Sequence, residues 1–208
     1  MNNRFNKVFP SFNPLNKEFS SGSQLIDIFF SCFFFHLFDK CNDNKLEAHS
    51  HQLDNIAITF SLNQSHALIV TDTSIKNNRA ISIAYIHVCD KPIIKTIYHV
   101  VNIILSKVKL FAIRYGISQA INIPEISKIF VITDSIYVVK RIFDLSIYLF
   151  QIYSASISKE LRKFFLLNTN NSIEFWKCLS WCNCSPFKVV DRETKQFCQS
   201  PMFPCKSS

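Results

Sequence analysis

Short runs of consecutive apolar residues, separated by polar turns, dominate the second half of the chain. Residues 67–70 and 128–133 are short, apolar and followed by polar residues, which is typical of buried strands. Residues 80–88 and 93–101 are rich in β-forming types and flank a four-residue turn, so they predict an antiparallel hairpin. Residues 172–178 alternate between apolar and polar types and predict a fifth strand.

Apolar residues at helical spacing lie between these runs. Leu110, Ile113 and Ile117 share one face of a helix, and Pro124 ends it. The predicted helices cover residues 106–120, 136–143, 156–167 and 188–197. A hairpin followed by strand–helix–strand crossovers predicts an α/β fold in which a mixed five-stranded sheet, antiparallel hairpin plus parallel crossovers, is flanked by helices.

The first 60 residues differ from the rest. They include loop-forming stretches, and we interpret 1–60 as an N-terminal extension or linker, partly disordered, ahead of a domain over 65–198. Residues 199–208 are expected to form a flexible tail. The apolar segment 25–38 is shorter than the ~20 residues that span a bilayer, so a buried or partner-facing segment is expected, with no membrane partner.

Two features indicate the compartment. Residues 1–12 have two positive charges but no apolar core behind them, unlike a signal peptide. The eight cysteines are therefore expected to be free thiols in a reducing compartment, cytoplasmic or nuclear. The cysteines near the end of the chain do not have the paired spacing of zinc knuckles, so no zinc is expected.

The composition excludes two classes of nucleotide-binding enzyme. The chain has 208 residues, of which 48% are hydrophobic, enough to form a packed core. Gly22 and Gly116 are the only glycines, so neither glycine-rich nucleotide fingerprint can be present. Dinucleotide enzymes of the Rossmann type and P-loop enzymes are thereby excluded, and no dinucleotide cofactor is expected.

Charge is distributed unevenly. Residues 1–60 carry five basic and six acidic side chains, whereas 61–208 carry 18 and 9, and the formal net charge is +8. A basic domain suits a polyanion such as nucleic acid or an anionic membrane surface. A merely solvated surface is the alternative, and charge alone does not separate the two.

Two aspartates follow the two short buried strands. Asp72 comes after 67–70 and Asp134 after 128–133. If these strands are parallel neighbours, their ends lie ~5 Å apart, and the carboxylates could then bridge two cations ~4 Å apart, as in phosphoryl-transfer nucleases. Alternatively, Asp134 caps the next helix and Asp72 opens a turn.

These motifs carry a family resemblance. The chain over 65–198 resembles the ribonuclease H domain that follows the reverse transcriptase of retrotransposons, in diverged or degenerate form. The segments that carry it are ALIVTDTSIKNN, the hairpin, KLFAIRYGISQA, KIFVITDSIYVVKRIF, SIEFWKC and FKVVDRETK. The resemblance implies a ribonuclease H-like fold and a metal-dependent endonuclease that hydrolyses the RNA strand of an RNA–DNA hybrid.

The family uses four carboxylates, and three can be carried over. Asp72 stands for the aspartate after the first strand, Asp134 for the one after the fourth strand, and Asp191 for the late aspartate. By resemblance they would hold two Mg²⁺ or Mn²⁺ ions. Nucleic-acid contacts are expected at Ser74, Lys76, Asn77, Ser135, Lys159, Arg162 and Lys163. For the last three, a solvated helix face is the alternative.

The fourth carboxylate is missing. The family's first helix begins its motif with Glu, and here the motif reads Lys109-Leu-Phe-Ala-Ile, with no acidic residue between Asp90 and Glu125. An ammonium ~5 Å from a divalent ion would be repelled by ~6–7 kcal/mol at an effective dielectric of ~20. Lys109 would either swing outward or pair with Asp72 or Asp134 in place of a metal. Both lower metal affinity.

The loop before Asp191 also departs from the family pattern. The loop 180–188 lacks the histidine and glycines of the family, which also favours slow turnover. We therefore expect an impaired nuclease. Two other functions stay open: an inactive module that binds nucleic acid, and an interaction protein that docks through the phenylalanine-rich segment 29–38.

Overall fold

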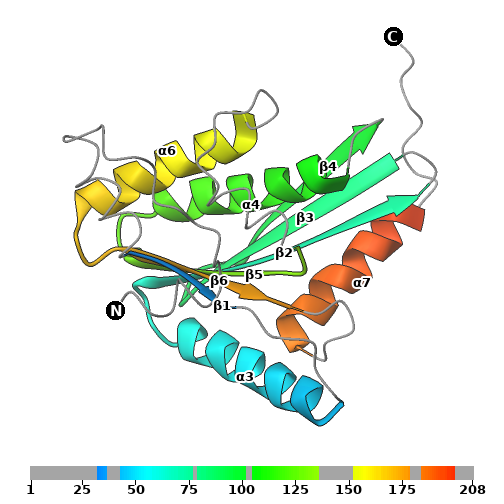
Figure 1. The fold of residues 1–208 in the computed structure, drawn as a ribbon, viewed down its shortest axis with the longest axis horizontal. Coiled ribbons are helices and arrows are strands. Elements are labelled where there is room, and N and C mark those ends of the chain that lie inside the picture. Colours follow the sequence, from blue (N-terminus) through cyan, green and yellow to red (C-terminus); the bar gives the residue numbers. More distant parts are fainter. Residues whose placement is uncertain are drawn as a thin grey trace, which may run out of the picture.

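The computed structural model describes residues 32–36, 43–76, 79–101, 105–135, 152–178 and 184–199, and these residues form six strands and four helices. The elements are β1 (Phe33–His36), α3 (Asp43–Ser61), β2 (His66–Lys76), β3 (Arg79–Val88), β4 (Ile94–Val101), α4 (Leu105–Ile121), β5 (Lys128–Thr133), α6 (Ile152–Leu167), β6 (Ser172–Lys177) and α7 (Ser185–Gln199). Figure 1 shows their arrangement.

The strands form one mixed sheet in the order β1-β6-β5-β2-β3-β4. β2, β3 and β4 are antiparallel neighbours, and β1, β6, β5 and β2 run parallel. The predicted mixed sheet is confirmed, with all five predicted strands present. The sixth strand, β1, comes from the apolar segment 25–38 and pairs with β6 from Phe33↔Ile173 to His36↔Trp176.

Strand β2 is longer than the sequence predicts. It was expected to stop near Asp72, but it continues to Lys76. The reason is its second partner: β3 pairs with β2 over its whole length up to Lys76↔Arg79, whereas the parallel pairing with β5 ends at Thr71↔Thr133. Asp72 therefore lies inside β2, directly beyond the last residue paired with β5.

Helices cover both faces of the sheet (Figure 1). Alternate residues of the central strands face opposite sides: Ile69 packs with α4 and α6, and Leu68 packs with α3 and α7. Both faces are buried, which explains why β2 and β5 read as unbroken apolar runs. Within the described ranges, no helix is both long and apolar enough to cross a membrane.

Helix α3 was not predicted. Leu53 and Ala57 are buried, Phe60 stacks on Phe130 of β5, and His49 Nε2 donates to Lys177 O at 3.1 Å. Most of the helix is polar, so its narrow buried stripe gives a weak periodic signal. The end of the predicted extension thus packs on the sheet.

The remaining predictions agree within a few residues at helix ends, as for α4, α6 and α7. The predicted helix 136–143 and Asn77 lie outside the described residues.

Gly116 permits the close approach of α4 to the sheet. A Cβ at this position would lie 2.6 Å from Ile69 Cγ2 on β2, and 3.7 Å from Ala84 Cβ on β3. No side chain fits at the first distance unless the helix or Ile69 moves. Lys109 lies seven residues before Gly116, two helical turns away on the same face. The short distance between α4 and the sheet therefore also sets how far Lys109 lies from the sheet.

Gly116→Ala is expected to destabilise the fold by about 1 kcal/mol. Overpacking a core costs about 1–3 kcal/mol, and the better helix propensity of alanine returns up to about 1 kcal/mol. Denaturant unfolding measures the difference. Gln119→Ala, on the same helix and half-buried, is the control and should change stability by less than about 0.5 kcal/mol. A Gly116→Ala variant as stable as the parent would contradict the tight helix–sheet contact.

Candidate functional site

Asp72 and Asp134 lie on neighbouring strands at one edge of the sheet. The last parallel pair is Thr71↔Thr133, and each aspartate is the next residue along its chain. At this point the two backbones are therefore about one strand spacing, ~5 Å, apart. The sequence predicted that these strands are parallel neighbours, and this is confirmed.

Asp72 is a buried carboxylate, only 7% exposed. Burial is the main cause that raises its pKa, and the charges of Asp134 and Asp191 add to it, while hydrogen bonds from Thr194 and the Thr73 backbone oppose it. Thr194 Oγ1 lies 2.5 Å from Asp72 Oδ2. This short contact joins β2 directly to α7.

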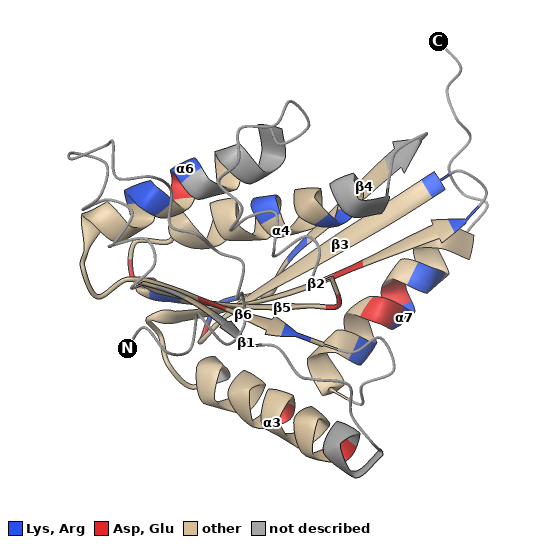
Figure 2. Ribbon diagram, viewed as in Figure 1, with Lys and Arg blue, Asp and Glu red and all other residues tan. Residues whose placement is uncertain are grey.

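Asp191 reaches the same edge from helix α7. Its charge acts on Asp72, and in Figure 2 the acidic segments of β2, the end of β5 and α7 lie close to one another. Its own carboxylate pairs with Lys195, one turn later, at 2.6 Å. The pair is largely solvent-exposed, and such i,i+4 pairs contribute only ~0.3–0.5 kcal/mol.

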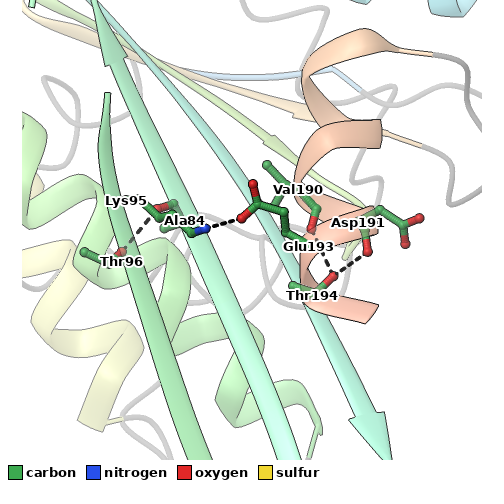
Figure 3. A network of polar contacts seen from close by, with 7 residues as sticks. All are labelled: Ala84, Lys95, Thr96, Val190, Asp191, Glu193 and Thr194. Carbon is green, nitrogen blue, oxygen red and sulfur yellow. Dashed lines mark hydrogen bonds and ion pairs between the residues drawn. The ribbon is translucent and has the colours of Figure 1, made fainter. Parts of the chain in front are cut away.

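Two contacts hold α7 in this position. Phe187 and Val190 are buried against the sheet. On the neighbouring face of the helix, Glu193 forms an ion pair with Lys95 of β4, across strand β3 (Figure 3). Glu193 therefore points away from Asp191, as expected for residues two apart on a helix.

Lys109 forms an ion pair with Asp134. Its Nζ lies 2.5 Å from Asp134 Oδ2, and the two side chains are only 14% and 17% exposed. From the sequence, Lys109 could point outward, pair with Asp72 or pair with Asp134. In the structure it pairs with Asp134. The other oxygen, Asp134 Oδ1, is buried and has no hydrogen-bond partner within the described part of the chain.

The other predicted contact residues fall into two groups. Ser74 and Lys76 on β2 and Ser135 after β5 lie along the carboxyl ends of these strands, near the aspartates. Lys159, Arg162 and Lys163 are exposed on α6, whose basic segments in Figure 2 lie away from the acidic segments of β2, β5 and α7. The structure does not bring this second group to the aspartates.

The residues present do not fit a pair of divalent ions. Lys109 occupies one oxygen of Asp134, Thr194 occupies one oxygen of Asp72, and Lys195 pairs with Asp191. Among the described residues, no three His, Cys, Asp or Glu side chains are arranged to hold a metal. Each of the three carboxylates thus contacts a donor from its own chain.

Three residues at this edge were missed by sequence reasoning. Thr194 and Lys195 follow Asp191 at helical spacings of three and four, a signal that could have placed them beside it. Arg79 pairs with Lys76 across the hairpin and adds a second exposed cation at its tip.

Comparisons with known proteins give structural similarity only. No family model matches the sequence, and no curated protein matches it. RNase H1 from the archaeon Halobacterium salinarum superposes with a TM-score of 0.43 and 12% identity, over 64% of this chain and 98% of the archaeal one. The protease–reverse transcriptase of prototype foamy virus gives a TM-score of 0.46 and 16% identity, over 66% of this chain and 22% of the viral one.

A third similar structure is the N-terminal RNase H domain of a Mycobacterium tuberculosis protein, solved as a fusion with maltose-binding protein. It gives a TM-score of 0.49 and 13% identity, over 61% of this chain and 94% of that one. Likeness at this level adds little to the chain's own topology. The strand order itself, an antiparallel hairpin joined to parallel crossovers, is the predicted ribonuclease H-like fold.

Asp72→Asn is expected to raise the Tm at neutral pH. The folded-state pKa of Asp72 lies above its unfolded value, so the folded protein binds the proton more tightly. The Asp72 carboxyl contributes its full stabilisation below the pKa that it has in the unfolded chain, and this contribution is lost as pH rises through its pKa in the folded protein. Asparagine does not ionise, so the variant should not lose stability in this way.

Thermal unfolding from pH 4 to 8 tests this, with Glu47→Gln as the control. Glu47 is exposed on α3, so its variant should change stability by less than about 0.5 kcal/mol. An Asp72→Asn protein that is less stable than the parent at pH 7 would show that the charged form of Asp72 supports the fold.

Proposed function

We propose that this chain carries a ribonuclease H-type domain that binds nucleic acid, with an RNA–DNA hybrid as the preferred ligand, and that its hydrolysis of the RNA strand is impaired. The observation that supports this is the Lys109–Asp134 ion pair within a group of three aspartates. The aspartates match the family's positions, and the lysine stands where the family has a glutamate. A diverged domain of retrotransposon origin accounts for both.

The charges favour a phosphate backbone as ligand. Lys76 and Arg79 are exposed at the tip of the β2–β3 hairpin, and Lys188 and Arg192 are exposed on α7. These cations flank the edge that carries the aspartates, with Ser74 and Ser135 as further hydrogen-bond donors. Cations of this kind position a duplex through its phosphates, whereas the acidic edge by itself would repel it.

Hydrolysis in this family depends on Mg²⁺ or Mn²⁺ held by four carboxylates. In this chain one of the four is replaced by Lys109, and the remaining carboxylates contact donors of their own chain. A binding module with little or no turnover follows from that arrangement. The five described cysteines are free thiols, which suits a reducing compartment, cytoplasmic or nuclear.

The domain is proposed to cover residues 65–198, with residues 1–60 as an extension before it and 199–208 as a tail. Helix α3 and strand β1 extend the packed part of the extension back to Phe33. Phe33–His36 pair with β6, so this part of the phenylalanine-rich segment is a strand of the chain's own sheet.

Replacing Lys76 and Arg79 together by alanine is expected to weaken hybrid binding. Each lost phosphate contact should also reduce the slope of log K against log salt by about 0.9. Gel shift or fluorescence anisotropy with a labelled hybrid, at several salt concentrations, measures both. The matched control is the double variant Lys159→Ala, Lys163→Ala, which removes two charges from α6, away from the aspartates.

The comparison decides between the two basic groups. Equal binding by the parent and the hairpin variant, with loss in the α6 variant, would place the nucleic acid on α6. No binding by the parent at any salt concentration would refute the proposed function.

Cleavage is the second test. With a labelled hybrid and Mg²⁺ or Mn²⁺, we expect RNA-strand cleavage close to background, because the metal donors are engaged by the chain's own groups. Asp134→Asn serves as the inactive reference. Rapid cleavage by the parent that disappears in Asp134→Asn would show that the site is catalytically intact, and the proposed impairment would be wrong.

A further inference from the structure

We infer that Lys109 is the resident counter-cation of this edge, so that the fold and its binding of nucleic acid require no divalent ion. The binding part of this inference rests on the proposed function. The folding part rests on the ion pair alone. The inference concerns what neutralises the acidic edge, and it departs from the metal-dependent behaviour that the family resemblance implies.

The helix backbone that carries Lys109 is held in place by the core. Val108 and Leu110, on either side of Lys109, are both buried in the core. Gly116, two turns later on the same face, holds α4 against Ile69. With its helix fixed in this way, Lys109 places Nζ 2.5 Å from Asp134 Oδ2, and most of both side chains is excluded from solvent. Solvent screening is therefore weak compared with that of a surface pair.

The charge balance also favours an internal cation. Four carboxylates would match the charge of two divalent ions. Here Asp72, Asp134 and Asp191 carry at most three negative charges, and Lys109 and Lys195 already supply two positive ones. Two further divalent ions would leave a large positive excess at one edge of the sheet, in a partly buried place where unpaired charge is costly.

Two other features of the molecule do not support an inference of their own. An apolar pocket of about 580 Å³ lies between α3, α7, the first half of β2 and the end of β3, but no feature of the described residues indicates what occupies it. The ion pair between Lys95 and Glu193 holds α7 against the sheet, and Lys95 Nζ also lies over the rings of Tyr85 and Phe197, so its contacts are with the chain itself.

Thermal unfolding with and without divalent ions tests the inference. The Tm of the parent should agree within about 1 °C in EDTA and in millimolar Mg²⁺ or Mn²⁺. Lys109→Glu should lower the Tm in EDTA by about 6–20 °C, because it leaves a buried carboxylate unpaired and adds another. Mn²⁺ should restore part of this loss, since the variant regains a fourth carboxylate.

Lys128→Glu is the matched control. It makes the same charge change at the exposed first residue of β5, at the other end of the strand from Asp134. Its Tm should not respond to Mn²⁺. If Lys109→Glu does not fold, Lys109→Gln takes its place with a smaller loss in EDTA, and titration of the parent with Mn²⁺ by calorimetry should give no binding in the millimolar range.

Two results would overturn the inference: a parent Tm that rises by several degrees with Mg²⁺ or Mn²⁺, or a Lys109→Glu protein as stable in EDTA as the parent. Gel shifts separate this inference from the proposed function. Hybrid binding that survives in EDTA supports both, and binding that appears only with Mg²⁺ overturns the inference alone. Absence of binding in both buffers refutes the proposed function and leaves the folding part of the inference to the Tm measurements.

Discussion

Strand β2 is bonded along both of its edges and covered on both of its faces, and the site takes its geometry from this constraint. The parallel pairing with β5 ends at Thr71↔Thr133 and brings Asp72 next to Asp134. The antiparallel pairing with β3 carries β2 on to Lys76. The close contact of Ile69 with α4 sets the distance of Lys109 from the sheet, and Asp72 accepts a hydrogen bond from Thr194 of α7.

Much of this arrangement follows from local pattern. β5 was predicted to the residue, because a short apolar run bounded by polar residues admits few alternatives. The adjacency of Asp72 and Asp134 followed from two such strands joined by a crossover. The far end of β2 was predicted wrongly, because polar residues after Val70 do not end a strand that still has a partner in β3.

Other features lay beyond sequence reasoning because they depend on distances between elements. Lys109 pairs with Asp134 and not with Asp72 because of where α4 crosses the sheet. That crossing depends on the close contact between Gly116 and Ile69, which are 47 positions apart in the chain. Thr194 was missed because a threonine in a helix usually bonds its own backbone, and here it also contacts a carboxylate from β2. Helix α3 was missed because its buried stripe is narrow.

The four residues of β1 also cover an edge of the sheet that could otherwise pair with another chain. Without them, β6 would be the outer strand of the sheet, and its free N–H and C=O groups would offer a template for another chain. Ile173 and Phe175 on β6 are apolar and buried, so this edge would be especially prone to aggregation once uncovered. Removing the first 60 residues to isolate the domain would therefore leave the edge of β6 unpaired and remove nearly all of α3. Poor solubility is the expected consequence.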